Sequence, residues 1–304
     1  MGCNAFQIFT RNPRGWAAKP IEEQEVRNFR KKLFSNSSKI YNDSVSVHMP
    51  YLPNLSSSND KLYEKSAAVL LEELQRCSLL GIPYLVLHFG SNLGQGSEKG
   101  LSQFINACAF ALEKYESSSS SPRLSFGKRK EIRRVREEKE QEKEKEKEEG
   151  TNRVMILVEN NAGQRNTIGS RFEDIRLILD KLKPFREKVG VCFDTCHAFA
   201  AGYDLRSEES VNTTIDRFDD IIGIRNLKMI HLNDSKDEIS SHRDRHEHIG
   251  FGKIGKEGFR ALCKHKAIAM LPFIMETPKE NQIQDLKTVL NLVHTKQKSI
   301  KYMT

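Results

Sequence analysis

Six apolar runs of the sequence each end in a residue that can bind a metal ion. One such residue at the end of a buried run is usually explained by a hydrogen bond to the surrounding chain. Six in register are hard to attribute to chance, and that many buried ionisable groups would be very costly without a partner. Divalent cations accept this mixture of nitrogen and oxygen donors, so the pattern predicts a metal site. The six residues are His48 after SVSV, His88 after YLVL, Glu159 after MILV, Asp194 after VGVCF, His231 after LKMI and Glu276 after PFIM.

The stretch VGVCFDTCHAFAAGYD allows two interpretations of Asp194, which is followed three residues later by His197. An aspartate after a strand often caps the next helix. The same pair also suits a metal site, and the stretch alone leaves both interpretations open. A second pair, Asp244 and His246, lies in the loop segment HRDRHEHIGFG and can converge on one ion when that loop is ordered. His242 and His248 are further candidates in that loop but are interpreted as loop residues. His265 and His294 are interpreted as helix residues, and Cys192 and Cys196 as residues that pack around the site.

Elements that could position these residues alternate along the chain. Seven short apolar runs, AFQIFT and the six above, are separated by stretches with helical spacing. Strands that are apolar throughout and alternate with helices predict a parallel sheet covered by helices, hence an α/β fold. Seven such units favour a (β/α) barrel, in which every strand directs its carboxyl end to one face. The expected helices are 21–33, 60–81, 101–115, 172–182, 207–221, 256–263 and 283–294.

Length and composition limit the classes of protein to which this chain can belong. The chain has 304 residues, 38% of them hydrophobic, which suffices for one large domain or two small ones; we expect one barrel domain over residues 1–304. There is no run of about eighteen apolar residues to span a membrane and no visible secretory leader. The six cysteines form no CxxC pair and indicate reduced, buried thiols. We therefore expect an intracellular protein, in the nucleus or mitochondrion of a eukaryote or otherwise in the cytoplasm.

A charged, low-complexity insertion interrupts the barrel pattern at residues 117–150. It opens with SSSSS, interpreted as a flexible linker, and continues with alternating Glu and Lys that cannot form a core. The insertion is therefore expected to be disordered or helical. Residues 123–149 hold eleven Lys or Arg and nine Glu, so the rest of the chain carries +8 − 2 = +6. This positive charge outside the insertion is compatible with a polyanionic binding partner. The cluster KRKEIRR at 128–134 is interpreted as solvated charge, with a nuclear-import or nucleic-acid patch as the alternative.

Seven further motifs can be compared with known families: HMPYLPNL, LHFGSN, VENNAGQ, FDTCHAFAAGYDL, HLNDSK, DRHEHIGFG and METP. Together they resemble the endonuclease IV family, the metal-dependent apurinic/apyrimidinic endonucleases of base-excision repair, and the resemblance runs from about Ala5 to Glu276. It implies a TIM barrel with three Zn²⁺ per chain and no organic cofactor. By position, the first ion is assigned His48, His88 and Glu159; the second shares Glu159 with Asp194, His231 and Glu276; the third is assigned His197, Asp244 and His246.

The same resemblance implies a reaction and a substrate. Glu159 is the bridging ligand that positions a hydroxide for attack on phosphorus. Cleavage is expected 5′ to an abasic site in double-stranded DNA and leaves a 3′-hydroxyl, and the site is expected to trim blocked 3′ ends. Four carboxylates against three divalent ions leave a formal +2, which suits one phosphodiester and a hydroxide. Arg14, Tyr51 and Leu52 match positions that enter the duplex, and an arginine, an aromatic and an aliphatic side chain suit that role.

The sequence also departs from the family pattern. One strand–helix unit is missing before AFQIFT, so seven strands are expected instead of eight, with the barrel open between the AFQIFT and PFIMET strands. Phe251 stands between two glycines where the family usually has glutamate. Two alternatives to the nuclease remain: a metal-dependent sugar isomerase or epimerase of related barrel fold, and an inactive DNA-binding remnant.

Overall fold

The computed structural model describes residues 3–35, 40–119 and 154–294. It divides into two compact units: unit 1 is Met1–Glu159 with Leu177–Val191, and unit 2 is Asn160–Arg176 with Cys192–Thr304. Residues 120–150 of the charged insertion, with the KRKEIRR cluster, lie outside the described residues.

All seven expected strands are present. They form one seven-stranded sheet in the order β1-β2-β3-β4-β5-β6-β9, with β1 and β9 at the two ends. The pairings β1–β2, β2–β3, β3–β4 and β6–β9 are parallel. The α/β prediction with parallel strands is therefore confirmed. The strands are β1 (Phe6–Ile8), β2 (Val45–His48), β3 (Tyr84–Leu87), β4 (Met155–Glu159), β5 (Val189–Asp194), β6 (Leu227–His231) and β9 (Phe273–Ile274).

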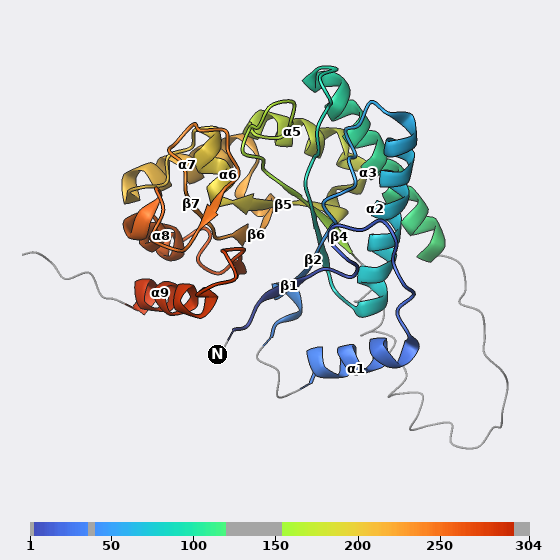
Figure 1. Cartoon of the computed structure of the whole chain (residues 1–304), viewed down its shortest axis with the longest axis horizontal. Coiled ribbons are helices and arrows are strands. Elements are labelled where there is room, and N and C mark those ends of the chain that lie inside the picture. The colour runs from blue at the N-terminus through green and yellow to red at the C-terminus, as the bar shows by residue number, and fades with distance from the viewer. Residues whose placement is uncertain (1–2, 36–39, 120–153, 295–304) are drawn as a thin grey trace, which may run out of the picture. The chain divides into compact units, whose positions relative to one another are not determined.

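Unit 1 places long helices between its strands, and α2 and α3 pack against each other (Figure 1). Local sequence sets the ends of α2. The Asn59 side chain accepts a hydrogen bond from the Leu62 amide at 2.9 Å, and Gly81 ends the helix at φ 75°. The helices that lie wholly in this unit are α1 (Glu23–Leu33), α2 (Asp60–Leu80), α3 (Ser97–Ser119), η1 (Asn42–Ser44) and η2 (Lys183–Lys188).

The expected flexible linker does not begin at Ser117. Residues Ser117–Ser119 complete α3, and the Ser117 hydroxyl donates to the Glu113 carbonyl at 2.8 Å. A helix that is already packed extends cheaply into a few polar residues, because each added residue gains a hydrogen bond without a new nucleation step.

Unit 2 contains helices that pack in sequence order, α7 on α8 and α8 on α9. It also contains a two-stranded antiparallel ribbon of β7 (Asp234–Ser235) and β8 (His246–Glu247), which was not expected. The helices are α6 (Thr195–Ala201), α7 (Glu208–Ile221), η3 (Ile224–Asn226), α8 (Gly255–Lys264) and α9 (Gln282–His294), while α5 (Phe172–Lys181) contributes residues to both units.

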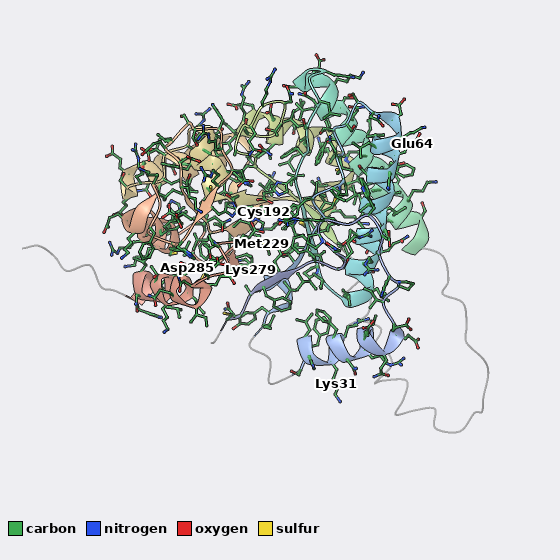
Figure 2. The ribbon with its side chains drawn as sticks, viewed as in Figure 1. Lys31, Glu64, Cys192, Met229, Lys279 and Asp285 are labelled. Atoms are coloured by element: carbon green, nitrogen blue, oxygen red, sulfur yellow. The ribbon has the colours of Figure 1, made fainter. Side chains whose placement is uncertain are left out.

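Burial explains why the strands are apolar throughout. Every residue of β2 and of β5 is buried, as expected for parallel strands covered on both faces. Large apolar side chains fill the space beneath the helices, such as Phe104 in unit 1 and Phe218 in unit 2. Cys192 and Met229 belong to this interior (Figure 2). Among the described residues, no helix is both long and apolar enough to cross a membrane.

Candidate metal centre

Unit 1 brings together His48, His88 and Glu159. His48 and Glu159 end β2 and β4, and His88 directly follows β3. The Nε2 atoms of His48 and His88 lie 3.4 and 3.7 Å from Oε2 of Glu159. Because β2, β3 and β4 are parallel neighbours, their carboxyl ends meet at one edge of the sheet. One ligand atom from each residue lies within 4.8 Å of the others, a set that could hold one ion.

Burial of this set is uneven. The side chains of His48 and Glu159 are 1% and 0% exposed, while that of His88 is 30% exposed. A charged carboxylate at full burial is costly unless a cation or a hydrogen bond compensates it. The buried Glu159 carboxylate would therefore compensate the charge of a cation held here, and solvent could reach that cation on the side of His88.

Asp194 is both a helix cap and a candidate ligand. It is the N-cap of α6, and its Oδ1 accepts the backbone N–H of His197 at 2.7 Å. Its Oδ2 accepts from Asn233 at 2.6 Å and lies 3.8 Å from Nε2 of His246 and 4.0 Å from Nδ1 of His231. Each carboxylate oxygen offers two lone-pair positions. Capping therefore leaves room for a metal, and the two interpretations of Asp194 are compatible.

Two asparagines that the sequence analysis did not single out hold candidate ligands in place. Asn160 donates to the Asp194 carbonyl at 3.0 Å and accepts from the Asp194 amide at 2.7 Å. The Asn233 amide side chain donates to the Asp194 carboxylate, and its Oδ1 accepts the Glu276 amide at 2.7 Å. Both stand within two residues of a strand-end ligand in the sequence, and this proximity is the signal that could have found them.

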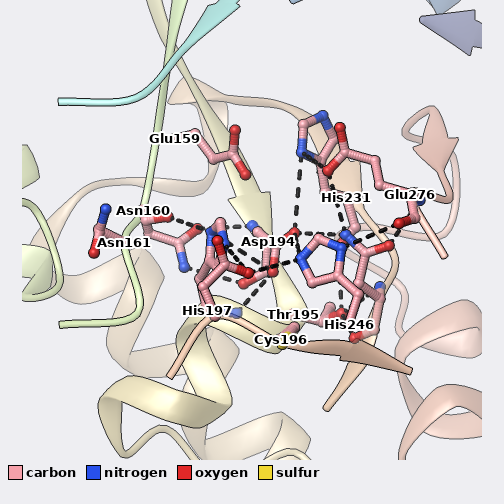
Figure 3. Close-up of polar contacts among 12 residues, drawn as sticks. Glu159, Asn160, Asn161, Asp194, Thr195, Cys196, His197, His231, His246 and Glu276 are labelled. Atoms are coloured by element: carbon pink, nitrogen blue, oxygen red, sulfur yellow. Dashed lines mark hydrogen bonds and ion pairs between the residues drawn. The ribbon is translucent and has the colours of Figure 1, made fainter. Parts of the chain in front are cut away.

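His231 and Glu276 form a second set of donors with Asp194 in unit 2. The Nδ1 atom of His231 lies 3.2 Å from Oε2 of Glu276. The His231 side chain is fully buried and that of Glu276 is 23% exposed, so this set also opens to solvent on one side. Figure 3 shows these side chains pointing toward Asp194.

A third set is built around Asp244. Its Oδ1 lies 3.1 Å from Nε2 of His197 and 3.2 Å from Nε2 of His246. His197 comes from the first turn of α6 and His246 from the unexpected strand β8, so the β7–β8 ribbon is what orders the loop (Figure 3). The D-x-H pair of the sequence thus meets the histidine that follows Asp194.

Within the third set, Asp244 and His246 shift each other's pKa. Burial alone would raise the pKa of Asp244, but hydrogen bonds and charge interactions with His197 and His246 outweigh it and hold that pKa below its ordinary value. Burial would lower the pKa of His246, yet Asp244 and Asp194 raise it to about 9. The surroundings therefore favour an ionised Asp244 beside a protonated His246. A divalent cation bound here would take the place of the extra proton on His246.

Histidine tautomers suit metal binding in both units. Nδ1 of His48 donates to the Met49 carbonyl at 2.7 Å, and Nδ1 of His197 donates to the Asn160 carbonyl at 2.9 Å. Nδ1 of His246 donates to the Glu276 carbonyl at 3.1 Å. A carbonyl can only accept, so Nδ1 carries the proton and Nε2 presents a lone pair, as in ligating histidines. The residues present fit zinc, which takes imidazole and carboxylate donors.

The Cys196 thiol lies beside two candidate ligands, although the sequence pattern indicates a packing residue. Its thiol, with one ligand atom each of Asp244 and His246, forms a group within 4.8 Å. Burial, with the nearby Asp194 charge, raises the pKa of Cys196 to about 12, so the thiol is protonated in the protein alone. Sγ donates to the Arg245 carbonyl at 3.7 Å. Cys192, by contrast, is fully buried in β5.

The other histidines near the loop make contacts outside these sets. His242 contacts the Ala162 carbonyl at 3.3 Å, and His248 contacts Asp285 at 2.8 Å. His265 caps the end of α8, and His294 ends α9. Phe251, the departure from the family pattern, is 69% exposed.

The expected DNA-contacting residues lie on two linked loops of unit 1. The Tyr51 amide donates to the Pro13 carbonyl at 2.9 Å, which joins the loop after β2 to the loop after β1. Arg14 is exposed, Tyr51 is 54% exposed and Leu52 is 39% exposed. The Tyr51 ring centroid lies 5.5 Å from that of His48. An exposed aromatic side chain therefore stands directly beside a candidate ligand.

The chain matches a known protein family over most of its length. Residues 1–296 match the family model described as xylose isomerase-like TIM barrel. The chain is 42% identical to the probable endonuclease 4 of Cenarchaeum symbiosum (strain A) over 288 residues, 95% of this chain and 89% of that protein. The seven-stranded parallel sheet is thus that of a TIM barrel family, as predicted.

Two solved structures have a similar fold. Endonuclease IV from Thermus thermophilus matches with a TM-score of 0.72 and 29% identity, over 96% of this chain and 89% of that chain. A D-tagatose 3-epimerase-like protein matches with a TM-score of 0.63 over 96% of this chain and 90% of that chain. The identity to the latter is 17%, so that likeness concerns the fold alone.

Proposed function

The chain belongs to the endonuclease IV family of xylose isomerase-like TIM barrels, and on that basis we propose that it is a zinc-dependent DNA repair endonuclease. It hydrolyses the phosphodiester 5′ to an abasic site in double-stranded DNA and leaves a 3′-hydroxyl. The same site trims blocked 3′ ends. One observation carries the proposal most directly: His48, His88 and Glu159 converge at the strand ends of a chain 42% identical to a probable endonuclease 4.

We assign three zinc ions to the nine candidate ligands. His48, His88 and Glu159 hold the first, and His197, Asp244 and His246 hold the third. Asp194, His231 and Glu276 hold the second with Glu159 as a shared ligand, the arrangement that the family resemblance implies. Bound zinc supplies Lewis-acid chemistry, polarising phosphate oxygens and making water more acidic.

The chain's own residues contribute orientation. Backbone carbonyls fix the proton on Nδ1 of His48, His197 and His246, which keeps each Nε2 directed at the site. Asn233 ties the Asp194 carboxylate to the Glu276 backbone, because its side chain donates to the one and accepts from the other. Preorganised donors of this kind avoid reorganisation during the reaction.

The decisive measurement is incision of a duplex that carries one abasic site, with an undamaged duplex as control. We expect a single cut 5′ to the lesion, loss of cutting after treatment with a zinc chelator, and recovery on adding Zn²⁺. Metal analysis of the folded protein should give three zinc ions per chain. A protein that binds the abasic duplex without cutting it would indicate a DNA-binding remnant. Turnover of a ketose without DNA cleavage would indicate an epimerase.

Lesion recognition is assigned to Arg14, Tyr51 and Leu52. An abasic nucleotide lacks stacking and pairing, so it leaves the helix at least cost and exposed side chains can fill its place. Arg14 is suited to phosphates or the groove, and Tyr51 and Leu52 to wedging between bases. Their exposure and the link between their loops support this assignment.

Replacing Tyr51 with alanine should weaken DNA binding and leave the metals in place. Loss of a stacking side chain costs on the order of 1–3 kcal/mol, or about ten- to hundredfold in affinity for the abasic duplex. Binding is measured by fluorescence anisotropy at fixed salt, since phosphate contacts make the affinity salt-dependent. Tyr51→Phe keeps the ring and should bind like the parent. If Tyr51→Ala binds and cuts abasic DNA as the parent does, the loop is only structural.

A further inference from the structure

Asp285 is a buried carboxylate in the first turn of α9, on a helix that supplies no candidate ligand (Figure 2). Its side chain is 2% exposed. Three donors satisfy it: the Thr277 hydroxyl at 2.7 Å and His248 Nδ1 at 2.8 Å on Oδ2, and the Ile249 amide at 3.0 Å on Oδ1. A buried carboxylate with this many partners has one well-defined orientation.

The partners of Asp285 adjoin two candidate ligands. Thr277 directly follows Glu276, and His248 is two residues after His246. These two segments also meet at the ligands themselves, because Nδ1 of His246 donates to the Glu276 carbonyl at 3.1 Å. Asp285 therefore ties the β8 loop and the segment after β9 to the same point on α9.

We propose that Asp285 is a positioning residue for the metal site of unit 2. It fixes the backbone on which Glu276 and His246 stand, so that the carboxylate of one ligand and Nε2 of the other keep their spacing. This inference rests on the proposed function, because it assumes that these ligands hold zinc. Asp285 itself is not one of the nine candidate ligands, and its hydrogen-bond partners are Thr277, His248 and Ile249.

The substitution that isolates this role is Asp285→Asn, which keeps the size of the side chain. An amide has one oxygen, whereas Asp285 accepts on both oxygens. Either the Ile249 amide or the pair of Thr277 and His248 then faces an NH₂ group and loses its acceptor. Removing partners outside the ligands typically costs about 10–100-fold in metal affinity. We expect about a tenfold loss because Asp285 acts through the backbone.

The experiment measures zinc affinity directly, by competition with a chromophoric chelator on the metal-free protein, after circular dichroism has verified that each variant is folded. For Asp285→Asn we expect a loss of affinity confined to part of the bound zinc, with the rest unchanged. The Co²⁺-loaded variant should show a changed visible absorption spectrum, since the geometry around the ion changes. Thr277→Val, which removes one of the three donors, should give a smaller change of the same kind and remains informative if Asp285→Asn does not fold.

Glu73→Gln in unit 1 is the matched control, because Glu73 is also a buried, hydrogen-bonded carboxylate, and its partners Thr10 and Arg11 are not candidate ligands. It should lower stability without changing zinc affinity. Zinc binding by Asp285→Asn and Thr277→Val equal to that of the parent overturns the positioning role and leaves the proposed function intact. A parent protein that binds no zinc overturns both.

Discussion

Glu159→Gln should abolish incision of abasic DNA more completely than substitution of any ligand that serves one ion. The glutamine side chain would present one neutral oxygen in place of a charged carboxylate beside His48 and His88. In the proposed cluster, Glu159 is the ligand shared by two ions, so both lose charge compensation together. Lewis-acid stabilisation is worth several kcal/mol, so we expect kcat/KM to fall by at least about 10³-fold.

Incision kinetics, metal analysis and duplex binding together check this expectation. The zinc content of folded Glu159→Gln should fall by more than one ion per chain, as determined by elemental analysis. The comparison is His246→Gln, which removes a neutral donor from the third set and should cost one ion at most. Duplex binding should largely persist in both variants, since neither residue belongs to the recognition loops. Equal zinc loss and equal activity in the two variants would show that Glu159 is an ordinary ligand of a single ion.

The fold and the convergence of most candidate ligands were predictable for related physical reasons. Strands that are buried on both faces must be apolar throughout, so a polar residue at the end of such a strand is conspicuous. His48 and Glu159 end their strands in the structure, and the parallel pairing of β2, β3 and β4 brings them to one edge. The order of strands also follows the chain up to β6, as expected when each connection carries a helix.

What could not be predicted depends on short elements and on tertiary contacts. Helix α6 has seven residues, too few to show a helical period, and each strand of the β7–β8 ribbon has two. The roles of Asn160 and Asn233 arise only from side-chain hydrogen bonds between segments distant in sequence. The helical state of Ser117–Ser119 reflects the packed helix before them, which overrides the weak preference of serine.

Loss of charge at Glu73 should destabilise unit 1 strongly. The Glu73 carboxylate, on α2, contacts Arg11 Nε at 2.6 Å and accepts from the Thr10 hydroxyl at 2.6 Å. Both side chains of the ion pair are at most 1% exposed. The pKa of Arg11 is raised even though burial opposes this, because the hydrogen bonds and charges of Glu72 and Glu73 outweigh it. Removing one partner of a buried pair leaves the other poorly compensated, which costs about 3–5 kcal/mol.

Urea unfolding of Glu73→Gln, followed by circular dichroism, should therefore show a free energy of unfolding about 3–5 kcal/mol below that of the parent. Glu72→Gln is the matched control, because Glu72 pairs with the same arginine at 2.9 Å but is 45% exposed, and solvent screens such a pair to about 1 kcal/mol or less. Arg11 also donates to the Trp16 carbonyl, so the loop that carries Arg14 should loosen when Glu73 is replaced. Affinity for abasic DNA should then fall while zinc content is kept. Equal, small losses of stability in the two variants would mean that water or a neighbouring group compensates Arg11, and that the buried pair does not hold the recognition loop.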